Sequence, residues 1–168
     1  MKLLSRHAGR GDDNFMIDKG LAARERAVDK RVAVVRGGGT GIGAATARAF
    51  ALDGYDVVIV GRRAEVLDAT AARVDAECER AGAVRSVTAD LTDPDQVERV
   101  VKAIDGRTVD VLVNNAGGYL APQAETLAGA AAFWRSNFDA NVLTAVLLTE
   151  ALLPALRRPG GRVTSPPW

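Results

Sequence analysis

The sequence predicts an α/β fold, a doubly wound parallel sheet with helices on both faces. The chain has three short, valine-rich apolar runs with the length of buried strands, residues 31–36, 57–60 and 109–113, and a further expected strand at residues 84–88. The segments between these runs place apolar residues at helical spacing. Strands separated by single helices pair in parallel through right-handed crossovers, and such sheets bind ligands at the carboxyl ends of their strands.

The first apolar run leads into a glycine-rich turn with the spacing Gly37-x-x-x-Gly41-x-Gly43. A helical pattern with apolar residues at one-turn intervals begins directly after this turn. Glycines let the backbone approach a ligand closely, and the unpaired amides and dipole of a helix N-terminus attract an anion. The turn therefore predicts a binding site for a dinucleotide phosphate. A glycine-rich strand-to-helix connection without a ligand is the structural alternative.

The next elements follow from the same periodicities. The run 57–60 is the second strand, and 84–88 is the third. The helix expected between them has one apolar face, made of Leu67, Ala71, Val74 and Cys78.

The helix after the third strand has a clear start signal. Asp93 is a capping carboxylate, Pro94 suits the first helical position, and Gln96 stands three residues after the cap. A buried stripe follows at the spacing i, i+3, i+4, i+7: Val97, Val100, Val101 and Ile104. The fourth strand, 109–113, then precedes helical sequence to about residue 158, and a fifth strand begins at Arg162.

Length and composition bound the function. The 168 residues suffice for one domain, expected at 31–168, while the polar residues 1–30 are expected to form a mobile extension. With 22 basic and 21 acidic residues the net charge is +1, so nucleic acid is not an expected partner. The single cysteine, Cys78, suits the cytoplasm, and no uninterrupted apolar run reaches the ~18–20 residues of a membrane span. No His, Cys and carboxylate cluster has the spacing of metal ligands.

Three motifs resemble the short-chain dehydrogenase/reductase family. The glycine turn is similar to the family's Thr-Gly-x-x-x-Gly-x-Gly, Asn114–Gly117 reads Asn-Asn-Ala-Gly like its strand end, and Asp90 is placed like the acidic residue that meets the adenine. The resemblance covers about residues 31–163 and implies a Rossmann-like fold, incomplete after the fifth strand. It also implies these dinucleotide contacts: Gly37, Thr40, Gly41, Ile42, Gly43, Asp90, Leu91, Asn115, Ala116 and Gly117.

The residues after the second strand favour NADP over NAD. An acidic side chain at this place would accept hydrogen bonds from the ribose 2′-hydroxyl of NAD. Here Gly61 is followed by Arg62 and Arg63, and no carboxylate occurs before Glu65. Two guanidinium groups suit a 2′-phosphate through charge-assisted hydrogen bonds. The alternative is a solvated basic pair in a loop.

Asn141 resembles the family's helix asparagine, which holds a backbone bend and supports the proton relay. A polar helix-breaking residue is the structural alternative. The helix from Val142 to Leu156 is apolar nearly all round, interrupted only by Thr144, Thr149 and Glu150. Such a helix needs cover on both faces, the sheet on one side and, as the resemblance implies, a second subunit on the other.

Arg36 is a departure from the family, which has a threonine at this strand end. A bulky charge there needs either an exit to solvent or an anion partner. A contact with the cofactor phosphate is one option. Damage to the glycine turn is the favoured interpretation, and replacement by threonine would then raise stability or cofactor affinity.

The family's catalytic residues are the second departure. The family's proton donor is a tyrosine followed four residues later by a lysine, with a serine upstream. Here the residue four positions after Tyr55 is Ile59, and the residue four positions after Tyr119 is Gln123. Ser165 comes too early in the chain to be the family's serine. Two prolines near the end cannot continue a central strand, so the tail has the pattern of a truncation or a frameshift.

The sequence thus predicts the NADP-binding part of a short-chain dehydrogenase/reductase. By family it is an oxidoreductase that transfers a hydride between nicotinamide and a carbonyl or alcohol carbon, but this chain is predicted to be inactive. Asn141 keeps only a supporting role. The alternatives are a non-catalytic nucleotide-binding or interaction module, and a gene fragment without function.

Overall fold

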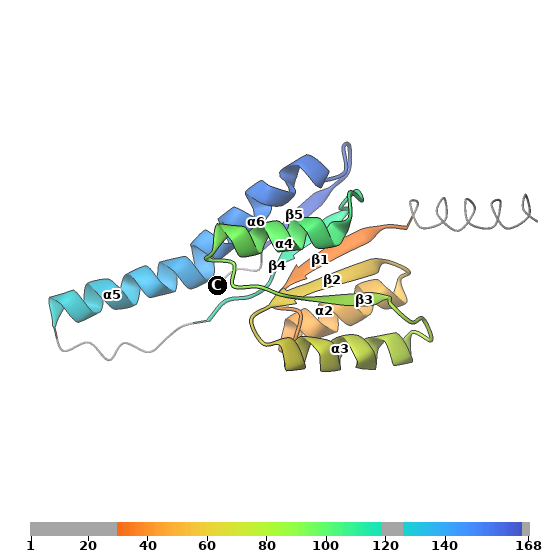
Figure 1. Cartoon of the computed structure of the whole chain (residues 1–168), viewed down its shortest axis with the longest axis horizontal. Helices are drawn as coiled ribbons and strands as arrows, with labels where there is room; N and C mark the ends of the chain where they lie inside the picture. Colours follow the sequence, from red (N-terminus) through yellow and green to blue (C-terminus); the bar gives the residue numbers. More distant parts are fainter. Residues whose placement is uncertain (1–29, 119–125, 166–168) are drawn as a thin grey trace, which may run out of the picture. The chain divides into compact units, whose positions relative to one another are not determined.

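Five parallel strands form the predicted sheet, in the order β3-β2-β1-β4-β5 (Figure 1). The computed structural model describes residues 30–118 and 126–165, so most of the expected extension lies outside the described residues. The strands are β1 (Val32–Arg36), β2 (Asp56–Gly61), β3 (Val84–Thr88), β4 (Val111–Asn114) and β5 (Arg162–Thr164). The parallel pairing confirms the predicted α/β fold class, with β1 beside β4.

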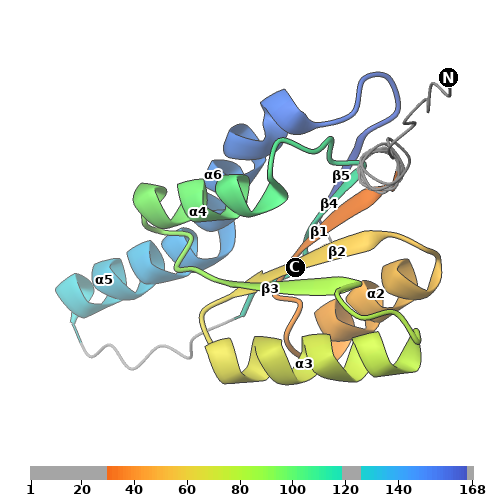
Figure 2. The same cartoon turned by 45° about the vertical axis from the view of Figure 1, so that its right-hand side comes forward.

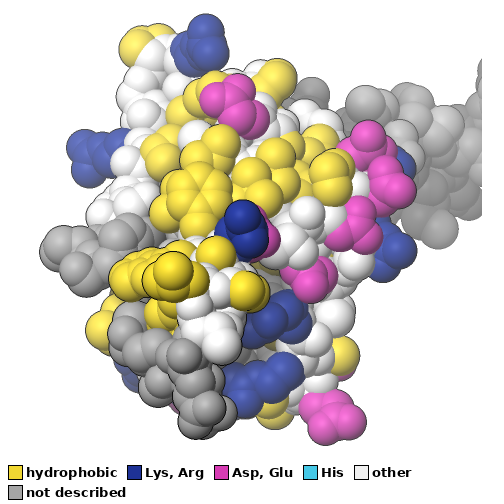
Figure 3. Space-filling view, turned by 90° about the vertical axis from the view of Figure 1, so that its left-hand side faces the viewer, with side chains coloured by type: hydrophobic (Ala, Val, Ile, Leu, Met, Phe, Trp, Pro, Cys, Tyr) yellow, Lys and Arg dark blue, Asp and Glu magenta, His cyan; other side chains and the backbone are white. Residues whose placement is uncertain are grey.

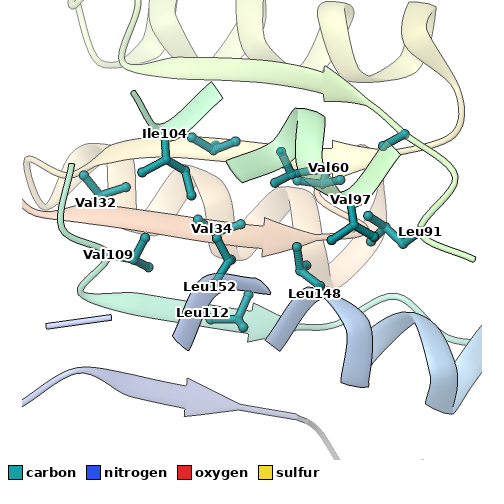
Figure 4. Packing of buried hydrophobic residues seen from close by; sticks show 13 residues of the cluster. Val32, Val34, Val60, Leu91, Val97, Ile104, Val109, Leu112, Leu148 and Leu152 are labelled. Atoms are coloured by element: carbon teal, nitrogen blue, oxygen red, sulfur yellow. The ribbon is translucent and has the colours of Figure 1, made fainter. Parts of the chain in front are cut away.

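Helices cover both faces of the sheet (Figure 2). On one face lie α2 (Gly41–Leu52) and α3 (Ala64–Glu77), and on the other lie α4 (Pro94–Ile104) and α6 (Thr144–Leu152). Because the central strands are buried from both sides, consecutive residues of β1 contribute to different halves of the core. Val34 packs beneath α4 and α6 (Figure 4), whereas Val35 belongs to the cluster on the other face, against α2 and α3.

The predicted start of α4 is confirmed in detail. The Asp93 carboxylate accepts a hydrogen bond from the Asp95 amide at 3.0 Å, and the Gln96 side chain donates to Asp93 at 2.9 Å. The first bond satisfies an orphan amide of the first turn, and the second holds the capping carboxylate in place. The stripe residues Val97, Val100 and Ile104 are buried against the sheet.

The last helical region is shorter at both ends than the sequence predicts, since it also stops at Ala155 and not near residue 158. Residues 115–118 are not helical, and α5 (Leu127–Phe138) begins after the cap Thr126, whose hydroxyl accepts from the Gly129 amide at 3.1 Å. The π-helical turn η1 (Asp139–Leu143), α6 and the 3₁₀ turn η2 (Leu153–Ala155) continue it without a break.

This 29-residue helix, Leu127–Ala155, is long and apolar enough to cross a membrane, by length and composition only. It is the one helix in the described part of the chain that meets this test. The expectation from uninterrupted apolar runs therefore overlooked it. Leu148 and Leu152 are fully buried on the sheet, while α5 has a single buried residue, Asn137. Within this long helix, α6 therefore packs on the core, whereas α5 is largely exposed.

A buried carboxylate, Asp110, ties the amino ends of the strands together. Its carboxylate accepts a hydrogen bond from the Val32 amide at 2.8 Å and forms an ion pair with Arg157. Asp110→Ala would leave the buried amide without an acceptor. We expect a loss of about 1.5–3 kcal/mol in the free energy of unfolding, measured by chemical denaturation.

Asp53→Ala is the matched control, because Asp53 pairs with Arg31 on the surface at 3.3 Å. Its expected cost is below about 1 kcal/mol. Equal costs for the two variants would contradict the role given to Asp110.

Candidate functional site

The glycine turn packs directly against the end of β4. A Cβ on Gly37 would lie 2.7 Å from the Ala116 Cβ, and one on Gly43 would lie 2.1 Å from the Gly37 carbonyl oxygen and 2.7 Å from Asn115 Nδ2. Gly37 also has a φ of +76°, which favours glycine. The turn and the Asn114–Gly117 segment are therefore neighbours, as expected if β1 and β4 are adjacent.

The N-terminus of α2 is open for an anion. Thr40 is the cap residue, but its side chain makes no capping hydrogen bond. The Ala44 amide is bonded to the Thr40 carbonyl at 3.2 Å, so the amides of Gly41, Ile42 and Gly43 precede the regular helical ladder. Ile42 is 76% exposed, which places this first turn at the surface. These amides and the helix dipole form a suitable phosphate site.

Arg62 and Arg63 follow β2 at the same carboxyl edge of the sheet. Both side chains are exposed, and neither forms a salt bridge with another described residue. At the amino edge the arrangement differs, because Arg80 and Arg107 both pair with Asp56, at 2.7 and 2.9 Å. The basic pair after β2 is thus available to an anionic ligand.

Asp90 lies after β3, close enough to Arg62 for an electrostatic interaction. Hydrogen bonds from the amide and hydroxyl of Thr92, both ending on Oδ1, hold the pKa of Asp90 below its usual range, and Arg62 adds to this effect. Oδ2 accepts no hydrogen bond from a described residue and can accept one from a ligand. The next residue, Leu91, is buried in the core.

Asn141 lies in the π-helical turn and is bonded to the loop after β4. Its side chain accepts from the Gly118 amide at 2.8 Å and donates to the Gly118 carbonyl at 2.9 Å. It also donates to the Asn137 carbonyl at 2.9 Å, within the bent part of the helix. Tyr119, the next residue of the loop, lies outside the described residues.

Arg36 differs from the sequence expectation. Its side chain has neither an exit to solvent nor an anion partner, since it is 3% exposed and donates to the Ala140 carbonyl at 2.6 Å and to the Thr144 hydroxyl. Burial lowers the pKa of Arg36 to about 10, so it is still charged at neutral pH. Beside Arg36, the Gly37 amide donates to the Val60 carbonyl at 2.7 Å. That Arg36 damages the turn stays a prediction, which the stability of Arg36→Thr would test.

Two buried polar atoms near Arg36 have no partner among the described residues: Arg36 Nη1, a donor, and Asn114 Oδ1, an acceptor. Arg36 and Asn114 are register partners on β1 and β4. Leaving a buried polar group without a partner costs about 1–3 kcal/mol. Unpaired buried groups are therefore rare away from functional sites.

The sequence patterns missed the roles of two threonines. Thr144 and Thr149 stood out only as interruptions of an apolar helix. In the structure Thr144 bonds Arg36, and Thr149 accepts from the Asn114 amide group at 3.1 Å. The available signal was the presence of two hydroxyl side chains in a helix that has to pack on the sheet. Within the described ranges no His, Cys, Asp and Glu cluster could hold a metal ion.

Curated relatives match this arrangement in sequence. A serine 3-dehydrogenase of Agrobacterium fabrum is 38% identical over 138 residues, which cover 79% of this chain and 51% of the relative. A sulfoacetaldehyde reductase of Chromohalobacter salexigens is 37% identical over 124 residues, 73% of this chain and 47% of the relative. The chain thus spans about half the length of the curated relatives it matches.

Solved structures match in fold as well. An alcohol dehydrogenase of the archaeon Thermococcus sibiricus, complexed with 5-hydroxy-NADP, has a TM-score of 0.70 at 30% identity, over 82% of this chain and 57% of that one. A blue fluorescent protein from a metagenomic library, in complex with NADPH, has a TM-score of 0.67 at 34% identity, over 80% and 54% of the two chains. The family model for short chain dehydrogenases matches residues 31–165, from β1 through β5. The chain therefore belongs to the short-chain dehydrogenase/reductase family of oxidoreductases, which bind a nicotinamide dinucleotide.

Proposed function

We propose that residues 31–168 are the NADP-binding domain of a short-chain dehydrogenase/reductase, with residues 1–30 as an extension outside it. The observation that carries the proposal is the open N-terminus of α2, together with two exposed arginines, Arg62 and Arg63, that form no salt bridge with a described residue at the same edge of the sheet. The fold, the turn and these charges fit one elongated ligand with several phosphates.

Each end of the cofactor has a matching group in the site. The amides of Gly41, Ile42 and Gly43 would bind the diphosphate, which the dipole of α2 also attracts. Asp90 Oδ2 would accept a hydrogen bond from the adenine amino group, beside Leu91. The nicotinamide end would then lie toward Asn115, Ala116 and Gly117, because β4 is the next strand beyond β1.

NADP is favoured over NAD by the charge after β2. A 2′-phosphate there would meet Arg62 and Arg63, which are exposed and form no salt bridge within the described part of the chain. A 2′-hydroxyl would find no acidic side chain before Glu65, in the first turn of α3. Two of the matched structures are complexes with 5-hydroxy-NADP and NADPH, which is consistent with this choice.

In calorimetric titrations we expect the unmodified protein to bind NADPH more tightly than NADH. Arg62→Ala should remove most of this preference, since a charge-assisted hydrogen bond contributes about 1.5–3 kcal/mol. Arg99→Ala, on the exposed surface of α4, makes the same change in net charge and should leave the preference intact. Gly43→Ala should abolish the binding of both cofactors, because the added methyl group collides with the Gly37 carbonyl. Equal affinities for NADPH and NADH in the unmodified protein would exclude NADP specificity.

The reaction proposed for the whole protein is hydride transfer between a nicotinamide and a carbonyl or alcohol carbon. This substrate class is supported by three of the similar proteins: a serine 3-dehydrogenase, a sulfoacetaldehyde reductase and an alcohol dehydrogenase. A bound cofactor supplies or accepts the hydride. A positioned acid must then supply a proton to the developing oxyanion during reduction.

These 168 residues do not offer the family's acid. Tyr55 and Tyr119 are the two tyrosines, and neither is followed by a lysine four residues later. The Asn141 amide does not give up a proton near neutral pH, and its side chain is bonded to Gly118 and Asn137. We infer that this polypeptide binds the cofactor without turning over a carbonyl substrate.

NADPH oxidation, followed by absorbance with a panel of aldehydes and ketones, is expected to stay at the rate of a heat-killed control. The missing general acid alone is expected to lower the rate by about 10²–10⁴-fold. Turnover that disappears in Tyr119→Phe would contradict this prediction and identify Tyr119 as a replacement acid.

We also propose that the helical region predicted from Val142 to Leu156, which ends at Ala155 in the structure, mediates self-association together with α5. Large apolar side chains at intervals of four or seven residues are exposed along it: Leu127, Trp134, Phe138, Val142 and Val146. Hydrophobic side chains gather in patches on the side of the molecule where α5 lies (Figure 3). Exposed apolar patches of this kind favour association.

We further propose the cytoplasm as the location of the protein, because a reducing compartment suits the single cysteine, Cys78.

If the helix mediates self-association, light scattering should detect species larger than the 17.7 kDa of one chain. Trp134→Glu, which places a charge in the exposed stripe, should shift the protein toward the monomer. Leu52→Glu is the control, because Leu52 is also half-exposed but lies on α2, which covers the opposite face of the sheet. A monodisperse monomer of the unmodified protein, without hydrophobic dye binding, would exclude the association.

A further inference from the structure

The π-helical turn η1 leaves one backbone carbonyl to be satisfied by side chains. The Thr144 amide donates to Asp139, five residues back, and so is not available to Ala140, its α-helical acceptor. The Ala140 carbonyl accepts instead from the Thr144 hydroxyl at 2.8 Å and from Arg36 Nη2 at 2.6 Å. Arg36 comes from the end of β1, so the sheet itself holds this turn of the helix.

The π turn determines where Asn141 points. Asn141 follows Ala140 directly and makes two hydrogen bonds with Gly118, in the loop after β4. Restoring α-helical register removes one residue from the turn and rotates the residues on one side of it by about 100° relative to the other. Asn141 and Gly118 could not keep both bonds after such a rotation.

We propose that Arg36 is a positioning residue: it holds the π-helical turn at Ala140 and so fixes Asn141 on Gly118. This coupling joins the end of β1, where the glycine turn begins, to the loop after β4. Its effect on the cofactor rests on the proposed NADP site, whereas the coupling between Arg36 and Gly118 does not.

The chemistry of an arginine suits this task. The side chain is long enough to cross from β1 to the helix, and its planar group donates to Ala140 and Thr144 at once. Its burial is costly, because the described residues give it only neutral acceptors and leave Nη1 unpaired. The polar contact on the helix is what offsets this cost.

The test is hydrogen exchange of the Gly118 amide, measured by NMR on the full chain. Arg36→Met should raise the Gly118 exchange rate about tenfold, the equivalent of one lost hydrogen bond. Asn141→Ala should do the same, and the double variant should show no further increase. Arg36→Lys should restore part of the protection, since an ammonium can still donate to Ala140. Arg157→Met, which breaks a structural ion pair with Asp110, should leave Gly118 unchanged relative to the core amide of Val58.

A Gly118 exchange rate in Arg36→Met equal to that of the unmodified protein would overturn the proposal. If Arg36→Met does not fold, Thr144→Val removes the second side-chain donor to Ala140 and should give a smaller increase at Gly118, and no increase would again overturn it. NADPH titration of the same variants separates the two proposals. Affinity losses that do not add in the double variant support action through Asn141, and additive losses would make Arg36 a direct ligand. Failure of the unmodified protein to bind NADPH refutes the proposed function but leaves the exchange result valid.

Discussion

The close packing of the glycine turn against the end of β4 is the constraint on which the rest of the site depends. Gly43 approaches the Gly37 carbonyl and the Asn115 side chain so closely that a methyl group has no room. This contact requires β1 and β4 to be neighbours, and it sets the path of the chain from β1 into α2. The amides at the start of α2 consequently face the carboxyl edge of the sheet, where a phosphate can reach them.

One long helix connects this edge to the opposite part of the core. Thr149 bonds Asn114, Arg36 bonds Ala140, and Asn141 bonds Gly118, so polar contacts link an apolar helix to the ends of β1 and β4. The packing of Leu148 and Leu152 holds the helix on the sheet. Because apolar contacts are non-directional, this packing does not fix the rotation of the helix about its own axis. The directional hydrogen bonds fix the rotation, and with it the position of Asn141.

Charge is distributed differently at the two edges of the sheet. At the amino edge, Asp56 and Asp110 each pair with arginines, and these pairs tie loops to strands. At the carboxyl edge, Arg62 and Arg63 form no salt bridge with described residues, and Arg36 is buried with neutral acceptors. Arginines without salt bridges therefore gather where the proposed ligand carries its phosphates, with Asp90 as the carboxylate that interacts with Arg62.

The sequence by itself determined the fold class, the order of strands and helices, the α4 cap at Asp93 and the glycine turn, because periodicity, capping and turn chemistry are local properties. The start of α5 was wrong, since the residues after β4 were taken as helical although 115–118 are not. Only the tertiary structure decided the role of Arg36. A charged residue at the end of a buried strand finds its partner 104 positions away, on a carbonyl freed by a π turn, and no local pattern encodes that contact.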